Sequence, residues 1–124
     1  MDQSAAASAN VKVISQTVLE DKYGLRVNLI AVTAAGGMVD LRLKILDGKK
    51  ASLLLQDKRN FPTLLTGDKN ITLHVDEDTK SQEIKFENNG GLYLIFPNSS
   101  NAVKPGSNVS VVFGDIQLEP ISAK

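Results

Sequence analysis

Hydrophobic and polar residues alternate along most of the chain after residue 10, a pattern typical of β-strands with one buried face. The clearest run places aliphatic residues at every second position and charged residues between them: Val39, Leu41, Leu43 and Ile45 alternate with Asp40, Arg42 and Lys44. An earlier run alternates in the same way, with Leu25, Val27, Leu29 and Ala31 on its apolar side. Residues 33–37 between the runs end in two glycines, which favours a hairpin with arms 25–33 and 38–46. Odd positions from 39 to 45 then point into the core and even positions point outward.

Further strands are predicted at 71–75, 84–86, 92–96 and 109–113. The run 92–96 is apolar at nearly every position, which favours a central strand covered on both faces. Pro105 and Gly106 fit the two central positions of a type II turn. The only predicted helix spans 49–56, where Ala51, Leu54 and Leu55 have helical spacing.

About seven strands and one short connecting helix predict an all-β protein, an antiparallel β-sandwich of the immunoglobulin-like kind. A chain of 124 residues fits one domain, which we place at 11–124. Residues 1–10 are small and polar, and we expect a disordered tail there. Ala5–Ala9 is similar to the small residues at the end of a secretory signal, so the chain is either a mature exported form or one with an ordinary flexible tail.

The charge balance and the absence of cysteine exclude several classes of function. Fourteen basic residues balance fourteen acidic ones, so no net positive charge attracts nucleic acid. No stretch approaches the roughly twenty apolar residues of a membrane-spanning helix, so no transmembrane segment is expected. With no cysteine, disulfides, thiolate catalysis and cysteine-based metal sites are excluded.

Three segments resemble small, uncharacterised, exported bacterial β-sandwich proteins. They are residues 36–42 with 46–47 and 50–51, residues 92–98, and residues 103–115. The resemblance as a whole extends over about half of the chain. The resemblance implies an immunoglobulin-like fold and an extracytoplasmic location, either periplasmic or secreted. It implies no activity, cofactor or catalytic residue.

Few residues offer catalytic or metal-binding chemistry. His74 is the only histidine, and one histidine without cysteine is more often a surface residue than a metal ligand. Asp76, Glu77 and Asp78 lack the spacing of a calcium loop, so a solvated acidic turn is the more common interpretation. No nucleophile motif is present. The sequence therefore predicts no enzyme, no cofactor and no metal.

The charged stripe on strand 39–45 is the candidate partner-binding face. Asp40, Arg42 and Lys44 share one side of the strand, and Arg26 on the preceding strand is placed to extend the stripe as a cross-strand ladder of ion pairs. Arg42 would anchor a partner on such a face. The alternative is a solvated outer face whose charges prevent aggregation.

We therefore expect a non-enzymatic extracytoplasmic binding or accessory domain whose partner is a protein or another envelope macromolecule. The alternative is a carrier of a small ligand or metal. A carrier needs a concave site with converging polar groups, whereas a protein-binding module needs an exposed patch or an open strand edge.

Overall fold

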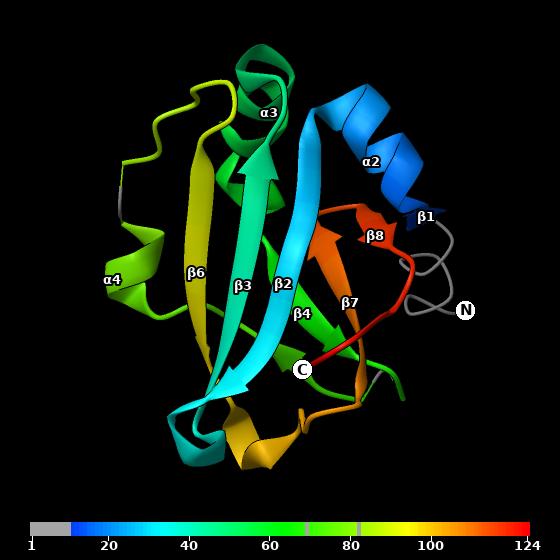
Figure 1. Cartoon of the computed structure of the whole chain (residues 1–124), viewed down its shortest axis with the longest axis vertical. Helices are drawn as coiled ribbons and strands as arrows, with labels where there is room; N and C mark the ends of the chain where they lie inside the picture. The colour runs from blue at the N-terminus through cyan, green and yellow to red at the C-terminus, as the bar shows by residue number, and fades with distance from the viewer. Residues whose placement is uncertain (1–10, 69, 82) are drawn as a thin grey trace, which may run out of the picture.

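The computed structural model describes residues 11–68, 70–81 and 83–124. Strands hold 39% of the described residues, and helices together with 3₁₀ turns hold 26%, so β structure predominates, as predicted. The strands form two sheets, one behind the other in Figure 1, with helices at their ends. The predicted disordered tail, residues 1–10, lies outside the described residues.

The elements follow one another in chain order as β1 (Lys12–Ile14), α2 (Gln16–Tyr23), β2 (Leu25–Thr33), β3 (Met38–Ile45), α3 (Gly48–Leu55), β4 (Thr63–Thr66), β5 (Thr72–Leu73), α4 (Glu77–Lys80), β6 (Gly91–Pro97), β7 (Asn108–Phe113), β8 (Ile116–Leu118) and β9 (Ile121–Ser122). Short 3₁₀ turns lie at Ala34–Gly36, Lys58–Asn60 and Ser99–Asn101.

The front sheet has three antiparallel strands in the order β2-β3-β6. The predicted hairpin is confirmed, because β2 and β3 pair along their length and a short turn at 34–37 joins them. The predicted alternation of β3 is confirmed on its core side, where Val39, Leu41, Leu43 and Ile45 are all buried.

A β-bulge corrects the alternation predicted for β2. Val27 pairs with Leu43, but Leu29 pairs with Arg42, so Asn28 is an extra residue. Beyond this bulge the faces exchange, and Ile30 enters the core in place of the predicted Leu29.

The strand prediction was wrong in two other places. β6, whose apolar run predicted a central strand, lies at the edge of the front sheet. Residues 84–86 form no strand, although Ile84 and Phe86 pack against the core from a loop. The apolar side chains of these segments indicate that the segments are buried. A buried segment need not pair with strands on both sides.

The back sheet has the order β1-β8-β7-β4-β5, with β9 beside β7. β1 and β8 are parallel, and the other pairs are antiparallel. The predicted strand 109–113 is confirmed as part of β7, where Val109, Val111 and Phe113 are fully buried. These side chains and the odd positions of β3 belong to one continuous core.

The predicted helix 49–56 is confirmed as α3, one residue earlier. Asp47 caps it by accepting hydrogen bonds from the N–H groups of Lys49 and Lys50, at 3.1 and 3.2 Å. The other helices were not predicted. In α2, Ser15 caps the start and Gly24 ends the helix with φ +65°, where a side chain would meet the backbone oxygen of Asp47 at 2.6 Å.

The C-terminal residue connects the two sheets. After β9, which pairs with β7 of the back sheet, the N–H of Lys124 donates to the carbonyl of Ile30 at 2.9 Å. The N–H of Val32 donates to the carbonyl of Lys124 at 2.8 Å. This part of the β2 edge therefore already has a backbone partner.

Candidate functional site

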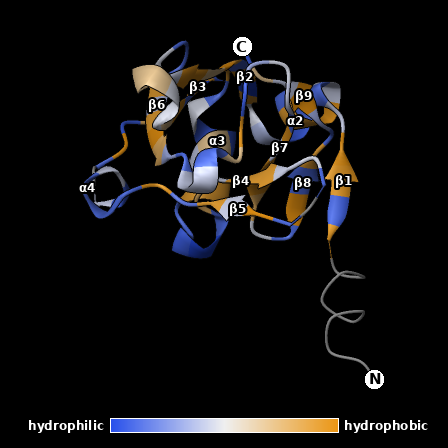
Figure 2. Cartoon of the chain, turned by 90° about the horizontal axis from the view of Figure 1, so that it is seen from below, coloured by the Kyte–Doolittle hydropathy of each residue, from blue (hydrophilic) through white to orange (hydrophobic). Residues whose placement is uncertain are grey.

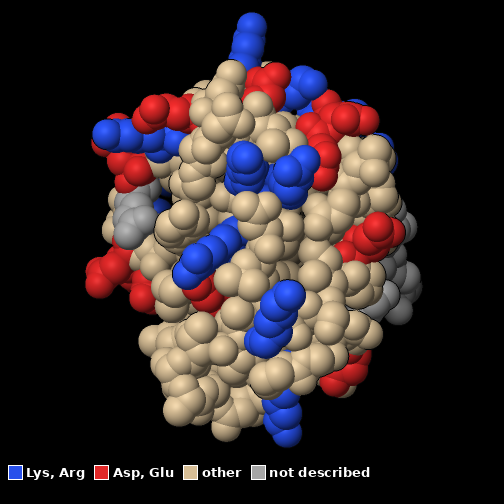
Figure 3. All heavy atoms as spheres, in the orientation of Figure 1, with Lys and Arg blue, Asp and Glu red and all other residues tan. Residues whose placement is uncertain are grey.

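The exposed side of the front sheet, called here the outer face, contains all four predicted site residues. Strand register groups its side chains into cross-strand rows: Arg26 with Lys44, Leu29 with Arg42 and Tyr93, and Ala31 with Asp40 and Ile95. Figure 3 shows this side of the molecule, with lysine and arginine side chains along its middle and most acidic side chains near its margins.

Asp40 and Arg42 form an ion pair in which the acid is buried. The Nε of Arg42 donates to Oδ2 of Asp40 at 3.2 Å. The Asp40 side chain is only 12% exposed, whereas the Arg42 side chain is 49% exposed. The second carboxylate oxygen, Oδ1, is buried and has no hydrogen-bond partner among the described residues. Asp40 is thus not the solvated residue that its outward position predicted, and Arg42 supplies its only described partner.

Tyr93 is the most exposed aromatic residue of the outer face, with 65% of its surface accessible. The guanidinium carbon of Arg42 lies 5.2 Å from the centroid of its ring, within the range of a cation–π interaction. The ring also covers Gly91, because a Cβ at that glycine would lie 3.0 Å from Cε1 of Tyr93. Tyr93 and Arg42 therefore form a preorganised pair on the surface.

Arg26 and Lys44 are adjacent in the register but carry like charges, so the predicted cross-strand ion-pair ladder does not form. Arg26 instead donates from Nε to Glu20 of α2 at 3.1 Å. This hydrogen bond and the charge of Glu20 raise the pKa of the Arg26 guanidinium. With Asp40 buried, the accessible charge in the middle of the outer face is positive.

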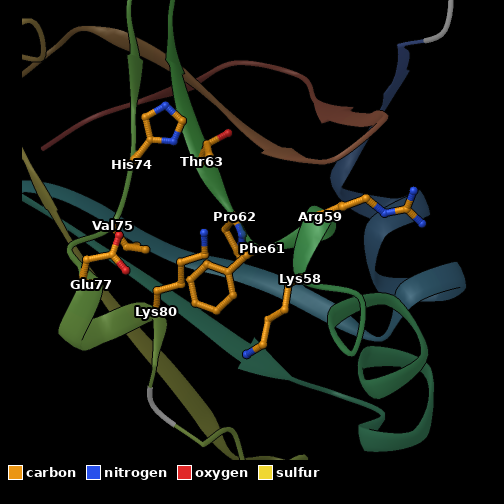
Figure 4. Close-up of a pocket in the computed structure, with 9 residues that line it drawn as sticks. All are labelled: Lys58, Arg59, Phe61, Pro62, Thr63, His74, Val75, Glu77 and Lys80. Carbon is orange, nitrogen blue, oxygen red and sulfur yellow. The ribbon is translucent and has the colours of Figure 1, made fainter.

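A second candidate is a pocket of about 380 Å³ beside α4, shown in Figure 4. Its cationic side chains are Lys58, Arg59 and Lys80, and its only acidic one is Glu77. The guanidinium of Arg59 is held by Asp57 at 2.7 Å and points away from the other lining side chains. The two lysines lie on either side of Phe61, whose ring is part of the pocket wall.

His74 lies at one end of this pocket, near Thr63. Its exposed position agrees with the prediction of a surface residue. No cluster of three or more possible metal-ligating side chains occurs within 11–68, 70–81 and 83–124. The cationic side chains of Lys58 and Lys80 favour an anion as the ligand of this pocket.

Asp76, which was considered for calcium, and two other acidic residues, Asp57 and Asp68, have structural roles. Asp76 caps α4, and its Oδ1 accepts from the N–H of Thr79 at 2.7 Å. Asp68 accepts from the hydroxyl of Thr66 at 2.6 Å, and Asp57 binds Arg59. Hydrogen bonds with Thr79, Thr66 and Arg59, respectively, lower the pKa of these three carboxyl groups.

Sequence analysis missed Tyr93 as a surface residue, because the run 92–96 was interpreted as apolar on both faces. The signal was present in the alternation, since Leu92, Leu94 and Phe96 occupy one side and position 93 the other.

The described helices include none with the length and apolar character needed to cross a membrane. Comparisons of the chain with protein-family models, with curated proteins and with solved structures gave no match.

Proposed function

We propose that this protein is a non-enzymatic binding module that attaches to another protein through its outer face. The observation that carries the proposal is the exposed pair of Tyr93 and Arg42. Tyrosine and arginine are enriched among the residues that contribute most to binding at protein interfaces. Because the ring and the guanidinium already contact each other, little side-chain entropy remains to be lost on binding.

The surroundings of this pair support the same function. Leu29 and Ile95 are partly exposed aliphatic neighbours, and Arg26 and Lys44 add positive charge at one end. An apolar centre with a charged rim is the usual composition of an interface. The extracytoplasmic location and the immunoglobulin-like relationship belong to this proposal and rest on the resemblance of the sequence segments.

Photochemical crosslinking in cells of the source organism tests the proposal. A benzophenone amino acid is placed at position 93, and a control carries it at position 53, because Leu53 on α3 is 71% exposed but lies away from the outer face. We expect a discrete protein adduct at position 93 only. Unlabelled native protein should compete it away, and a Tyr93→Ala protein should compete poorly. Equal adducts at both positions, or none at position 93, would refute the proposal.

The pocket beside α4 favours a second candidate function, a carrier of a small anion. Lys58 and Lys80 offer ammonium groups on either side of Phe61, whose ring forms an apolar part of the pocket wall. An NMR titration with inorganic phosphate tests this function. We expect saturable shifts at the pocket that Lys80→Gln weakens at least about fivefold, which is about 1 kcal/mol. The control Lys104→Gln, at an exposed lysine outside the pocket lining, should leave them unchanged.

A further inference from the structure

The outer edge of β6 carries backbone groups with no described partner. Ile45 donates to Gly90 and Asn98 donates to Gly37, which fixes the pattern of hydrogen bonds between β3 and β6. Along a strand of an antiparallel pair, residues whose N–H and C=O groups point toward the partner strand alternate with residues whose groups point away from it. Leu92, Leu94 and Phe96 therefore bond to β3, and the N–H and C=O groups of Tyr93 and Ile95 point away from it.

The described residues provide no strand that pairs with this edge, since β6 pairs only with β3. Figure 1 shows α4 beside β6, and Figure 2 shows that α4 lies at the level of β4 and β5 instead of in the plane of the front sheet. α4 therefore does not occupy the position of a fourth strand.

The edge also lacks the usual protection against pairing. Natural edge strands are commonly short, charged, bulged or covered. β6 is seven residues long and has no charged residue, and only Pro97 at its end lacks an N–H donor. At the other edge of the sheet, Lys124 already bonds to β2. Strand addition requires an exposed sheet edge, and β6 provides one.

The two faces beside this edge define the chemistry of the added strand. On the outer face, Arg42 and Lys44 supply positive charge within about one Debye length of a neighbouring strand. On the inner face, the side chains of Leu92, Leu94 and Phe96 are buried in the apolar core. A complementary strand has acidic side chains on one face and apolar side chains on the other, so the two kinds alternate along its sequence.

We propose that β6 accepts an extended segment of a partner protein, in which acidic and apolar residues alternate, as the fourth strand of the front sheet. This inference rests on the proposed function, because it specifies how the partner is bound. The backbone groups of Tyr93 and Ile95 supply the hydrogen bonds, and Arg42 and Lys44 select acidic side chains.

The probe is an acetylated and amidated nonapeptide in which glutamate and valine alternate, added to ¹⁵N-labelled protein. We expect saturable binding with a Kd below about 1 mM, with slower hydrogen exchange at the amides of Tyr93 and Ile95. A peptide of alternating lysine and valine should bind at least about tenfold more weakly. No binding, equal binding of both peptides, or protection at amides away from β6 would overturn the proposal.

Methylated peptides test strand addition without altering the protein. In an extended peptide, the N–H groups of the valines point to one edge and those of the glutamates to the other. One strand can pair with β6 through a single edge. One peptide is therefore N-methylated at its valines and another at its glutamates. Only one of the two modifications should abolish binding. Equal effects of the two methylated sets would exclude pairing through one edge.

Ile95→Pro removes one outward N–H donor, and the pattern with β3 predicts that no hydrogen bond inside the sheet is lost. We expect at least about tenfold weaker peptide binding, whereas Ile95→Ala, which keeps the N–H, should change it less than about threefold. Circular dichroism and urea unfolding verify that both variants are folded. If Ile95→Pro does not fold, the methylated peptides still decide the question.

Three results separate this inference from the proposed function. Crosslinking at position 93 without any peptide signal would retain the binding face and refute strand addition. Peptide binding at β6 without a cellular adduct would retain the acceptor edge and refute the outer face as the native interface. Dimerisation of the protein alone, with its Tyr93 and Ile95 amides protected, would refute the peptide occupant in favour of a second copy of the chain.

Discussion

Removal of Arg42 should destabilise the protein mainly because it leaves the buried carboxylate of Asp40 without a partner. Asp40 is largely buried, one of its oxygens already lacks a partner, and Arg42 provides the bond to the other. In the Arg42→Ala variant, a nearly buried carboxylate has neither a cation nor a described hydrogen-bond donor. Replacing Asp40 by valine in that variant should therefore restore stability.

The expected sizes follow from the burial of the two side chains. An exposed ion pair contributes only about 0.2–1 kcal/mol and a stacked cation about 0.5–1 kcal/mol. Loss of the last partner of a buried charged group adds about 1–3 kcal/mol, so Arg42→Ala should cost about 2–5 kcal/mol. Asp40→Val removes the charge and adds a β-branched side chain between Ala31 and Ile95. In the Arg42→Ala background it should recover about 1–3 kcal/mol.

Urea unfolding at pH 7, followed by circular dichroism, is measured for the native protein, Arg42→Ala, Asp40→Val and the double variant. The four free energies give the cost of Arg42→Ala and the stability that Asp40→Val restores. The slope of the free energy against urea should stay constant, since the surface exposed on unfolding is nearly unchanged. The reasoning fails if the double variant is no more stable than Arg42→Ala alone. It also fails if Asp40→Val is the more destabilising single change, because the buried anion would then contribute net stability.

The remaining predictions concern the core, a buried amide and acid stability. Leu41→Ala should cost about 2–5 kcal/mol in urea unfolding, because it opens a cavity in a fully buried part of β3; a cost below about 1 kcal/mol would contradict this packing. Asn98→Ala should cost about 2–4 kcal/mol, because its amide makes three hydrogen bonds, to Gly36 and Val103; Ser99→Ala, an exposed neighbour, is the control. The carboxyl groups of Asp57, Asp68 and Asp76 have lowered pKa values in the folded protein, so their ionised forms contribute stability above about pH 3.9. This stability is lost as the pH falls through those lowered pKa values, so the urea midpoint should fall in acid. The fall should be less steep in variants that carry asparagine at these positions. An unchanged acid profile in all three variants would show that other groups control it.

The parts of the fold that the sequence predicted are those determined by local pattern. The β2–β3 hairpin follows from alternation on both sides of a glycine-containing turn, and α3 follows from the helical spacing of Ala51, Leu54 and Leu55. α2 has only one fully buried residue, Leu19, so its helical period was weak. Its caps, Ser15 and Gly24, were the available signal.

Features that depend on the pairing of distant segments could not be predicted. The bulge at Asn28 follows from the register with β3, which alternation in one strand does not reveal. The four candidate residues do share one face, but the burial of Asp40 and the pairing of Arg26 with Glu20 depend on neighbours contributed by other elements. The edge position of β6 depends on its pairing with β3 alone, whereas its apolar run predicted a central strand.

The bond between Lys124 and β2 limits how many partners the front sheet can join. Lys124 occupies the β2 edge at Ile30 and Val32. The bulge at Asn28 distorts the part of β2 that precedes these residues. A strand added at β6 therefore leaves no equivalent edge at which a further molecule continues the sheet. If β6 accepts a strand as proposed, the protein would end a row of paired strands instead of extending it, so complexes formed through this sheet would have one-to-one stoichiometry and would not grow into filaments.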